Sequence, residues 1–382
     1  MSTYSFDTII DRRATASIKW SKYADDGDVI PMWVADMEFA TSPAIQQALT
    51  KRIDHPIYGY THAPQSLVTE VQDYLQRQFN WSIDPDWLVW LPGVVPGLTM
   101  CCRIAGEPGS EILVNSPVYH PLLEIPELTD RKRVCVPMLH SNHRWSIDFD
   151  ALEAAITENT SALLLCSPHN PVGTLFTDTE LARVADICAA RNVLVISDEI
   201  HCDLILDPER KHCPTVKAAP ALADHIITLM SPNKTFNLAG ANCSFAIISN
   251  PVLRKKYQDA CHYVLPIMPT FSYVAAEAAY RDGWDWHSQL IDYLRGNHEY
   301  LRNKINNIEG LWMDPCEATY LGWINTGQLP VDDAGELFRA AGVGLSPGAQ
   351  FGDPDYQRLN FACPRSQLEE GLRRIKSAVD SL

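Results

Sequence analysis

The middle of the chain alternates short apolar runs with longer amphipathic stretches, and this alternation limits the folds that it can adopt. Uninterrupted apolar runs of this kind are typical of strands that are covered on both faces of a sheet. Strands that alternate with helices build a mostly parallel, doubly wound sheet, so the sequence predicts an α/β fold. The apolar runs lie at residues 111–114, 133–137, 162–166, 193–197, 226–230 and 244–248, and the amphipathic stretches include residues 148–157 and 179–191.

The length of the chain and a change of pattern near residue 285 predict two domains. The 382 residues exceed the roughly 250–300 residues over which a single hydrophobic core grows. Beyond residue 285, a long polar-rich helix over residues 287–308 precedes short strands and a closing helix over residues 366–379. We expect a large domain at residues 41–285, a smaller α+β domain at residues 286–382, and an N-terminal segment, residues 1–40, that packs with the small domain.

The excess of acidic side chains argues against nucleic acids and membranes as partners. The formal charge of −16 arises from 47 acidic and 31 basic residues, and such a surface repels phosphate backbones and anionic lipids. No apolar run approaches the roughly 18–20 residues that span a bilayer. The first residues lack the basic and apolar regions of a secretory signal, so we expect a cytoplasmic protein.

The eleven cysteines do not suggest a disulfide framework or a metal site. Their number is odd and no C-x-x-C occurs, so no zinc site is indicated and we expect no metal. No G-x-G-x-x-G follows a predicted strand, which argues against a dinucleotide-binding Rossmann enzyme.

Polar side chains of complementary chemistry follow three of the predicted strands. Asn170 follows the run at residues 162–166, Asp198 follows the next run, and Lys234 follows the run at residues 226–230. In an open α/β sheet, ligands bind beyond the carboxyl ends of the strands. The sequence therefore predicts that an amide, an acid and an amine meet at one edge of the sheet.

These three groups match what pyridoxal 5′-phosphate requires of a protein. A lysine amine condenses with its aldehyde, a carboxylate keeps its pyridine nitrogen protonated, and a polar side chain binds its ring hydroxyl. The glycine-containing turn at residues 93–97 has free backbone N–H groups that can hold a phosphate at the start of a helix. Each residue also has an ordinary structural interpretation, as an exposed lysine, a helix cap or a turn residue, but their joint placement favours the cofactor.

The sequence resembles fold-type I pyridoxal-phosphate enzymes of the aspartate aminotransferase superfamily, and within them the PatB/MalY branch of cystathionine β-lyases and C–S lyases. The motifs that carry the resemblance extend from DRR at residues 11–13 and PMWVADM at residues 31–37 to CPR at residues 363–365. The resemblance implies a C–S β-lyase that cleaves cystathionine or related cysteine S-conjugates to a thiol, pyruvate and ammonia. An aminotransferase of an L-amino acid and a cofactor-bound regulatory protein are the alternatives.

The resemblance also implies a role for each residue that matches a family motif. Lys234 matches the lysine that is bonded to the cofactor, Asp198 the partner of the ring nitrogen, and Asn170 the partner of the ring oxygen. The remaining matches are Tyr119 stacked on the ring, Val94, Val95 and Ser231 at the phosphate, Tyr60 reaching the phosphate from a neighbouring subunit, and Arg365 and Ala35 at the substrate, where Arg365 would hold the α-carboxylate. The contact from Tyr60 implies a homodimer with a shared active site.

Two departures from the aminotransferase pattern favour the lyase branch. His201 stands three residues after Asp198, where aminotransferases usually carry Tyr, and Asn242 stands eight residues after Lys234, where they usually carry a phosphate-binding Arg. The sequence leaves open whether His201 contacts the ring hydroxyl or is a structural histidine. It assigns no role to Asp36.

Overall fold

A large mixed sheet forms the centre of the protein, whose computed structural model describes residues 4–382. Its eight strands lie in the order β2-β9-β8-β7-β6-β3-β4-β5. The five from β8 to β4 pair in parallel, whereas β9 and β2 at one end and β5 at the other pair antiparallel. The strands are β2 (Leu88–Leu91), β3 (Glu111–Ser116), β4 (Lys132–Ser141), β5 (Arg144–Ile147), β6 (Thr160–Cys166), β7 (Leu194–Asp198), β8 (Ile226–Met230) and β9 (Ser244–Ile247).

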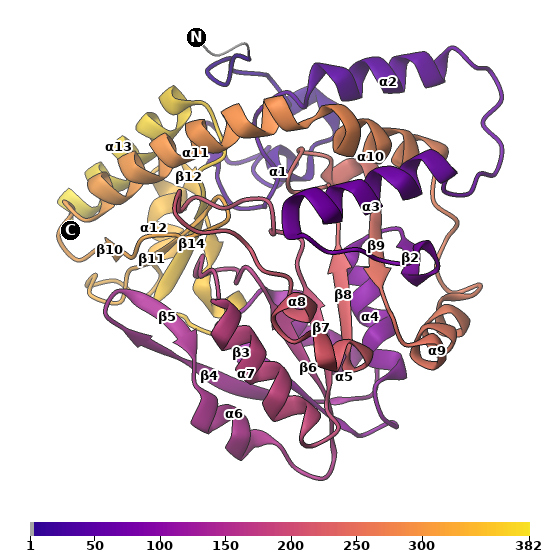
Figure 1. Ribbon diagram of the computed structural model, residues 1–382. Helices are drawn as coiled ribbons and strands as arrows, with labels where there is room; N and C mark the ends of the chain where they lie inside the picture. Colours follow the sequence, from indigo (N-terminus) through magenta and orange to yellow (C-terminus); the bar gives the residue numbers. More distant parts are fainter. Residues whose placement is uncertain (1–3) are drawn as a thin grey trace.

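Helices cover both faces of this sheet, so the predicted α/β fold is confirmed (Figure 1). Successive residues of β6 show why, because Leu163 and Leu165 belong to one apolar core and Ala162 and Leu164 to another. One core includes residues of α3 (Gln65–Phe79), α6 (Phe149–Ala155), α7 (Asp178–Ala189), α8 (Thr215–Ala218) and α10 (Thr270–Asp282), and the other includes residues of α4 (Val94–Ile104), α5 (His120–Leu128) and α9 (Pro251–Cys261).

Gly97 lets helix α4 lie close to the sheet. A Cβ at this position would lie 2.6 Å from a methyl carbon of Leu229 and 2.7 Å from one of Leu91. Both distances are shorter than carbon atoms tolerate, so with a larger residue here the leucine side chains or the helix would have to shift. The close packing fixes the N-terminal end of α4 relative to the strand ends.

A smaller lobe contains a four-stranded antiparallel sheet, as predicted for the C-terminal part of the chain (Figure 1). The strands lie in the order β10-β11-β14-β13, and they are β10 (Trp312–Met313), β11 (Leu321–Asn325), β13 (Ser346–Pro347) and β14 (Tyr356–Asn360). Three helices accompany them, namely α11 (Trp284–Ile305), α12 (Ala334–Ala340) and α13 (Arg365–Asp380).

The N-terminal residues reach this smaller lobe through a short strand. β1 (Ile30–Pro31) pairs in parallel with β12 (Val343–Gly344), and the backbone N–H of Glu38 donates to the carbonyl of Ala362. In the chain, α1 (Ile18–Ser21) precedes β1 and α2 (Pro43–Ile53) follows it, and α2 packs against α10. The domain boundaries at residues 40 and 285 stay predictions. Within residues 4–382, no helix has the length and apolar character needed to cross a bilayer.

Candidate active site

A cavity of about 410 Å³ lies where the carboxyl ends of the central strands meet the N-terminal residues and the smaller lobe. Asp198, the last residue of β7, lines it together with Asn170 and Lys234 from the loops after β6 and β8, and Cys166 at the end of β6 also lines it. The predicted convergence of amide, acid and amine is therefore present. The opposite wall comes from residues 33–35 and from Ser346 and Arg358 of the smaller lobe; Pro92, Pro96, His120, Ile200, Ala239 and Gln350 are among the other lining residues.

The structure brings most of the predicted site residues to this cavity, but not all of them. Lys234, Asp198, Asn170, Tyr119, Val94, Val95 and Ala35 line it, whereas Ser231, Tyr60 and Arg365 do not.

Asp198 ends strand β7 as a buried carboxylate that no cation neutralises among the described residues. Its one hydrogen bond comes from the backbone N–H of Ile200, at 3.2 Å. Burial raises the pKa of Asp198 to about 7, the nearby charge of Glu199 adds to the rise, and Lys234 opposes it. A protonated pyridine nitrogen is a partner of the kind that this carboxylate lacks, so the residue fits the cofactor that the resemblance implies.

Lys234 follows strand β8 and donates a hydrogen bond from Nζ to the backbone carbonyl of Ala35 at 2.5 Å. Burial lowers the pKa of the Lys234 amine to about 8; Arg358 contributes in the same direction, while Asp36 and Asp198 oppose it. An exposed lysine titrates near 10.4, so this amine is neutral in a far larger fraction of molecules at neutral pH. A neutral amine can attack an aldehyde and accept a proton.

Arg358 is a buried cation that faces the cavity without a carboxylate partner within residues 4–382. Its guanidinium donates to Asn170 Oδ1 at 3.0 Å and to the carbonyl of Trp33 at 2.9 Å, and its Nε is buried with no partner. Burial lowers the pKa of Arg358 to about 10, which still leaves it charged at neutral pH. A charged fork of this kind binds a planar carboxylate in two places.

Arg365, the residue predicted to hold the substrate carboxylate, lies outside the cavity. It is the first residue of α13, its Nε donates to Asn297 Oδ1 at 2.9 Å, and its guanidinium lies 4.6 Å from the ring centre of Tyr300. The sequence reasoning overlooked Arg358. Arg358 is a charged residue inside β14 (Tyr356–Asn360), whose residues are all buried, and a charge in such a strand indicates a functional role.

The N-terminus of α4 forms the end of the cavity that can hold an anion. Val94 and Val95 begin this helix, and no side chain caps its first N–H groups. Uncapped N–H groups and the helix dipole favour a phosphate there. Ser231 does not reach this end, since its hydroxyl donates to the carbonyl of Cys243 at 2.6 Å and accepts from the backbone N–H of Asn233.

Tyr119 and His201 also line the cavity. The backbone N–H of Tyr119 donates to the carbonyl of Asn170 at 2.9 Å, which fixes the ring beside the amide. Because Asn170 Oδ1 already accepts from Arg358, its NH₂ group is the part free to donate into the cavity. Burial lowers the pKa of His201 to about 3, so its imidazole is neutral, and its ring centre lies 6.1 Å from that of Tyr320.

Comparisons with known proteins agree with this geometry. Residues 28–375 match the family Aminotransferase class I and II. The chain is similar to cystathionine beta-lyase PatB of Bacillus subtilis, with 34% identity over 98% of this chain and 100% of PatB. Among solved structures, OvoB is 39% identical with a TM-score of 0.97, covering 99% of this chain and 100% of OvoB. The PLP-bound C–S lyase of Staphylococcus hominis is 31% identical with a TM-score of 0.93, covering 99% and 98%.

The raised pKa of Asp198 makes the stability of the cofactor-free protein depend on pH. A carboxyl group whose pKa rises on folding stabilises the fold fully below its unfolded pKa of about 4, and this contribution is lost as the pH rises toward about 7. We therefore expect the free energy of unfolding of Asp198→Asn to exceed that of the parent by roughly 2–4 kcal/mol at pH 8. Near pH 4 the two free energies of unfolding should be almost equal.

Denaturant unfolding of both cofactor-free proteins at the two pH values measures this effect. Asp186→Asn, which changes an exposed carboxylate on α7, is the matched control and should leave stability unchanged at both. Equal stabilities of Asp198→Asn and the parent at pH 8 would contradict the burial of an ionisable Asp198.

Proposed function

The chain belongs to the aminotransferase class I and II family, and within it we propose a pyridoxal 5′-phosphate-dependent C–S β-lyase that acts on cystathionine or related cysteine S-conjugates. The observation that carries the proposal is one cavity that brings together Lys234, which is partly buried, with Asp198 and Arg358, which are buried. PatB, named a cystathionine beta-lyase, and the C–S lyase of S. hominis support the choice of reaction within the family.

The cofactor would occupy the part of the cavity that the strand ends form. Lys234 would bond to it covalently, Asp198 would lie at its ring nitrogen, and the NH₂ group of Asn170 at its ring oxygen. Tyr119 would stack on the ring, and the first N–H groups of α4 would hold its phosphate. When bound, pyridoxal 5′-phosphate supplies an electron-accepting ring that stabilises negative charge at the substrate Cα.

The smaller lobe would bind the amino-acid end of the substrate. Arg358 would exchange its contact with the carbonyl of Trp33, or use its unpartnered Nε, to hold the α-carboxylate. This would place Cα near Lys234. When the substrate amine replaces Lys234 in the covalent bond to the cofactor, Lys234 would be released as a neutral amine, which can take up the Cα proton. Departure of the β-sulfur as a thiol leaves a three-carbon fragment, which hydrolyses to pyruvate and ammonia.

An assay with pure protein, pyridoxal 5′-phosphate and L-cystathionine tests the proposal. We expect equal amounts of homocysteine thiol, pyruvate and ammonia, and no turnover by Lys234→Ala, because no other lysine amine lines the cavity among the described residues. Amino acids that convert the cofactor to its pyridoxamine form without releasing pyruvate would instead establish the aminotransferase. Cofactor binding without turnover of any amino acid would favour the regulatory alternative.

The choice between two arginines gives a second test of the substrate site. We expect Arg358→Met to lower kcat/KM about a hundred-fold or more, mainly through KM, because it removes a buried charged contact with the carboxylate. Arg365→Met should stay within about three-fold of the parent, since Arg365 contacts Asn297 and Tyr300 instead. A larger loss of kcat/KM in Arg365→Met than in Arg358→Met would instead assign the binding of the substrate carboxylate to Arg365. Unchanged cofactor absorbance serves as the control for both variants.

We also propose that two copies assemble into a homodimer with shared active sites, in the cytoplasm. An exposed apolar surface supports the assembly, because Tyr60 is 94% exposed beside a hollow lined by Tyr58, Ile267 and Phe271. The resemblance places the equivalent of Tyr60 at the phosphate of a neighbouring subunit. All eleven cysteines are free thiols, as is usual in a reducing compartment.

Replacement of Tyr60 tests the shared site. Because Asn242 stands where aminotransferases usually carry Arg, we expect Tyr60→Phe to weaken cofactor binding about ten-fold, the loss of one hydrogen bond to a charged group. Titration of the cofactor-free protein with pyridoxal 5′-phosphate measures this. Tyr263→Phe, with the same 94% exposure, is the control. Unchanged affinity of Tyr60→Phe, or a monomer in sedimentation, would refute the shared site.

A further inference from the structure

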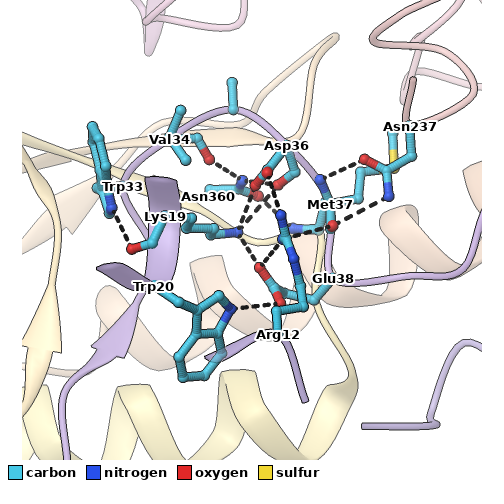
Figure 2. A network of polar contacts seen from close by, with 12 residues as sticks. Arg12, Lys19, Trp20, Trp33, Val34, Asp36, Met37, Glu38, Asn237 and Asn360 are labelled. Carbon is cyan, nitrogen blue, oxygen red and sulfur yellow. Dashed lines mark hydrogen bonds and ion pairs between the residues drawn. The ribbon is translucent and has the colours of Figure 1, made fainter. Parts of the chain in front are cut away.

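Side chains donate hydrogen bonds to five consecutive backbone carbonyls in the segment that crosses the cavity, residues 33–38. Figure 2 shows the donors to the carbonyls of Val34, Asp36 and Met37. Buried carbonyls need hydrogen-bond donors, and here side chains from widely separated parts of the chain donate, rather than the backbone N–H groups of a neighbouring strand. The donors are Arg358 and Ser346 to the carbonyl of Trp33, Asn360 to that of Val34, Lys234 and Tyr320 to that of Ala35, Asn360 and Lys19 to that of Asp36, and Asn237 and Arg12 to that of Met37.

Two members of this set are cavity groups with proposed roles in the reaction. Lys234 donates to the carbonyl of Ala35 at 2.5 Å, and Arg358 donates to that of Trp33 at 2.9 Å. Tyr320 donates to the same carbonyl of Ala35 at 3.0 Å. The position of the segment therefore sets where the Lys234 amine rests when it carries no other bond.

Four charged side chains, which we call the charge cluster, fix the far half of the segment (Figure 2). They are Arg12, Lys19, Asp36 and Glu38. Lys19 is 1% exposed, and its Nζ lies 2.8 Å from Glu38 Oε1 and 3.4 Å from Asp36 Oδ1. Arg12 lies 2.7 Å from Asp36 Oδ2 and 2.8 Å from Glu38 Oε1.

The charge cluster has no net charge when all four groups are ionised, and a residue outside it donates a further hydrogen bond to it. Two cations face two acids, and Trp20 Nε1 donates to Glu38 Oε2 at 3.1 Å. Burial would raise the pKa of Asp36, but the hydrogen bond from Arg12 and the charges of Lys19 and Arg12 outweigh it and lower that pKa. Buried ion pairs contribute little net stability, so their better-attested use is to select one arrangement of the chain.

The charge cluster also acts on Lys234 electrostatically. Asp36 stabilises the protonated amine and Lys19 opposes it. The other charged or titratable groups that face this amine are Arg358, Asp198, His201 and Tyr320. Asp36 is thus both the neighbour of Ala35 in the chain and a charge that Lys234 senses.

We propose that the charge cluster is a positioning device for Lys234 that acts through residues 33–38. It holds the carbonyl of Ala35 as the acceptor for the amine, which leaves the lone pair of a neutral amine directed elsewhere. It also sets the local charge at that amine through Asp36 and Lys19. The inference rests on the proposed role of Lys234 in the reaction, but the geometry that carries it does not depend on the substrate.

Chemical labelling of Lys234 in the cofactor-free protein tests this. Acetic anhydride reacts with neutral amines, so the pH midpoint of Lys234 acetylation, followed by mass spectrometry, reports when the amine loses its proton. We expect Lys19→Met to raise the midpoint, because a neighbouring positive charge is lost. Asp36→Asn should lower it. Each shift should be about one pH unit, the scale of one charge at a partly buried site.

The opposite directions distinguish positioning and charge from a merely structural role. If the charge cluster has only a structural role, both variants should melt at lower temperatures. Their acetylation midpoints should then either stay unchanged or both move toward the midpoint of an exposed lysine. Lys376→Met, an exposed lysine on α13, is the matched control and should leave the midpoint in place. Unchanged midpoints in both variants would overturn the proposal.

Failure of folding does not remove the test. If Lys19→Met does not fold, the nearly isosteric Asp36→Asn decides alone, and a midpoint that does not fall overturns the proposal. The labelling uses neither cofactor nor substrate, so its outcome is separate from that of the cystathionine assay. In the holoenzyme, the same two variants should shift the pH dependence of the absorbance of bound cofactor.

Discussion

Three ionisable side chains that are buried or partly buried line one cavity, and no ion pair neutralises any of them in the part of the chain that the structure describes. They are Asp198, Lys234 and Arg358, and burial is the largest cause of the pKa shift of each. Charges are expensive to bury unless a partner compensates them. The apolar cores on both faces of the sheet supply the stability that offsets this free-energy cost. In the proposed function, Asp198 and Arg358 would each meet a ligand group of opposite charge, whereas Lys234 would form a covalent bond with the cofactor.

Much of this arrangement could be predicted from the sequence, because it depends on local pattern. The apolar runs before Asn170, Asp198 and Lys234 mark β6, β7 and β8, and parallel pairing of these neighbours brings their carboxyl ends together. Strand β5 was not predicted. It pairs with β4 across a turn at Asn142 and His143, both with positive φ, and His at such a position is a weak turn signal.

The second wall of the cavity could not be predicted in the same way. Which arginine faces the cavity depends on how the smaller lobe packs against the strand ends. The sequence motif pointed to Arg365, which does not line the cavity, whereas Arg358, seven residues earlier and inside β14, does. The carbonyl contacts of residues 33–38 were equally hidden, because their donors range from Arg12 to Asn360 in the sequence.

The sulfur atom in the cavity wall has a chemical consequence. Cys166 is buried, its Sγ donates to the carbonyl of Pro168 at 3.4 Å, and burial raises the pKa of its thiol. Thiolates, not thiols, attack electrophiles and disulfides. In the elimination proposed above, a thiol kept protonated in this way would be a poor nucleophile toward the unsaturated product that would form beside it.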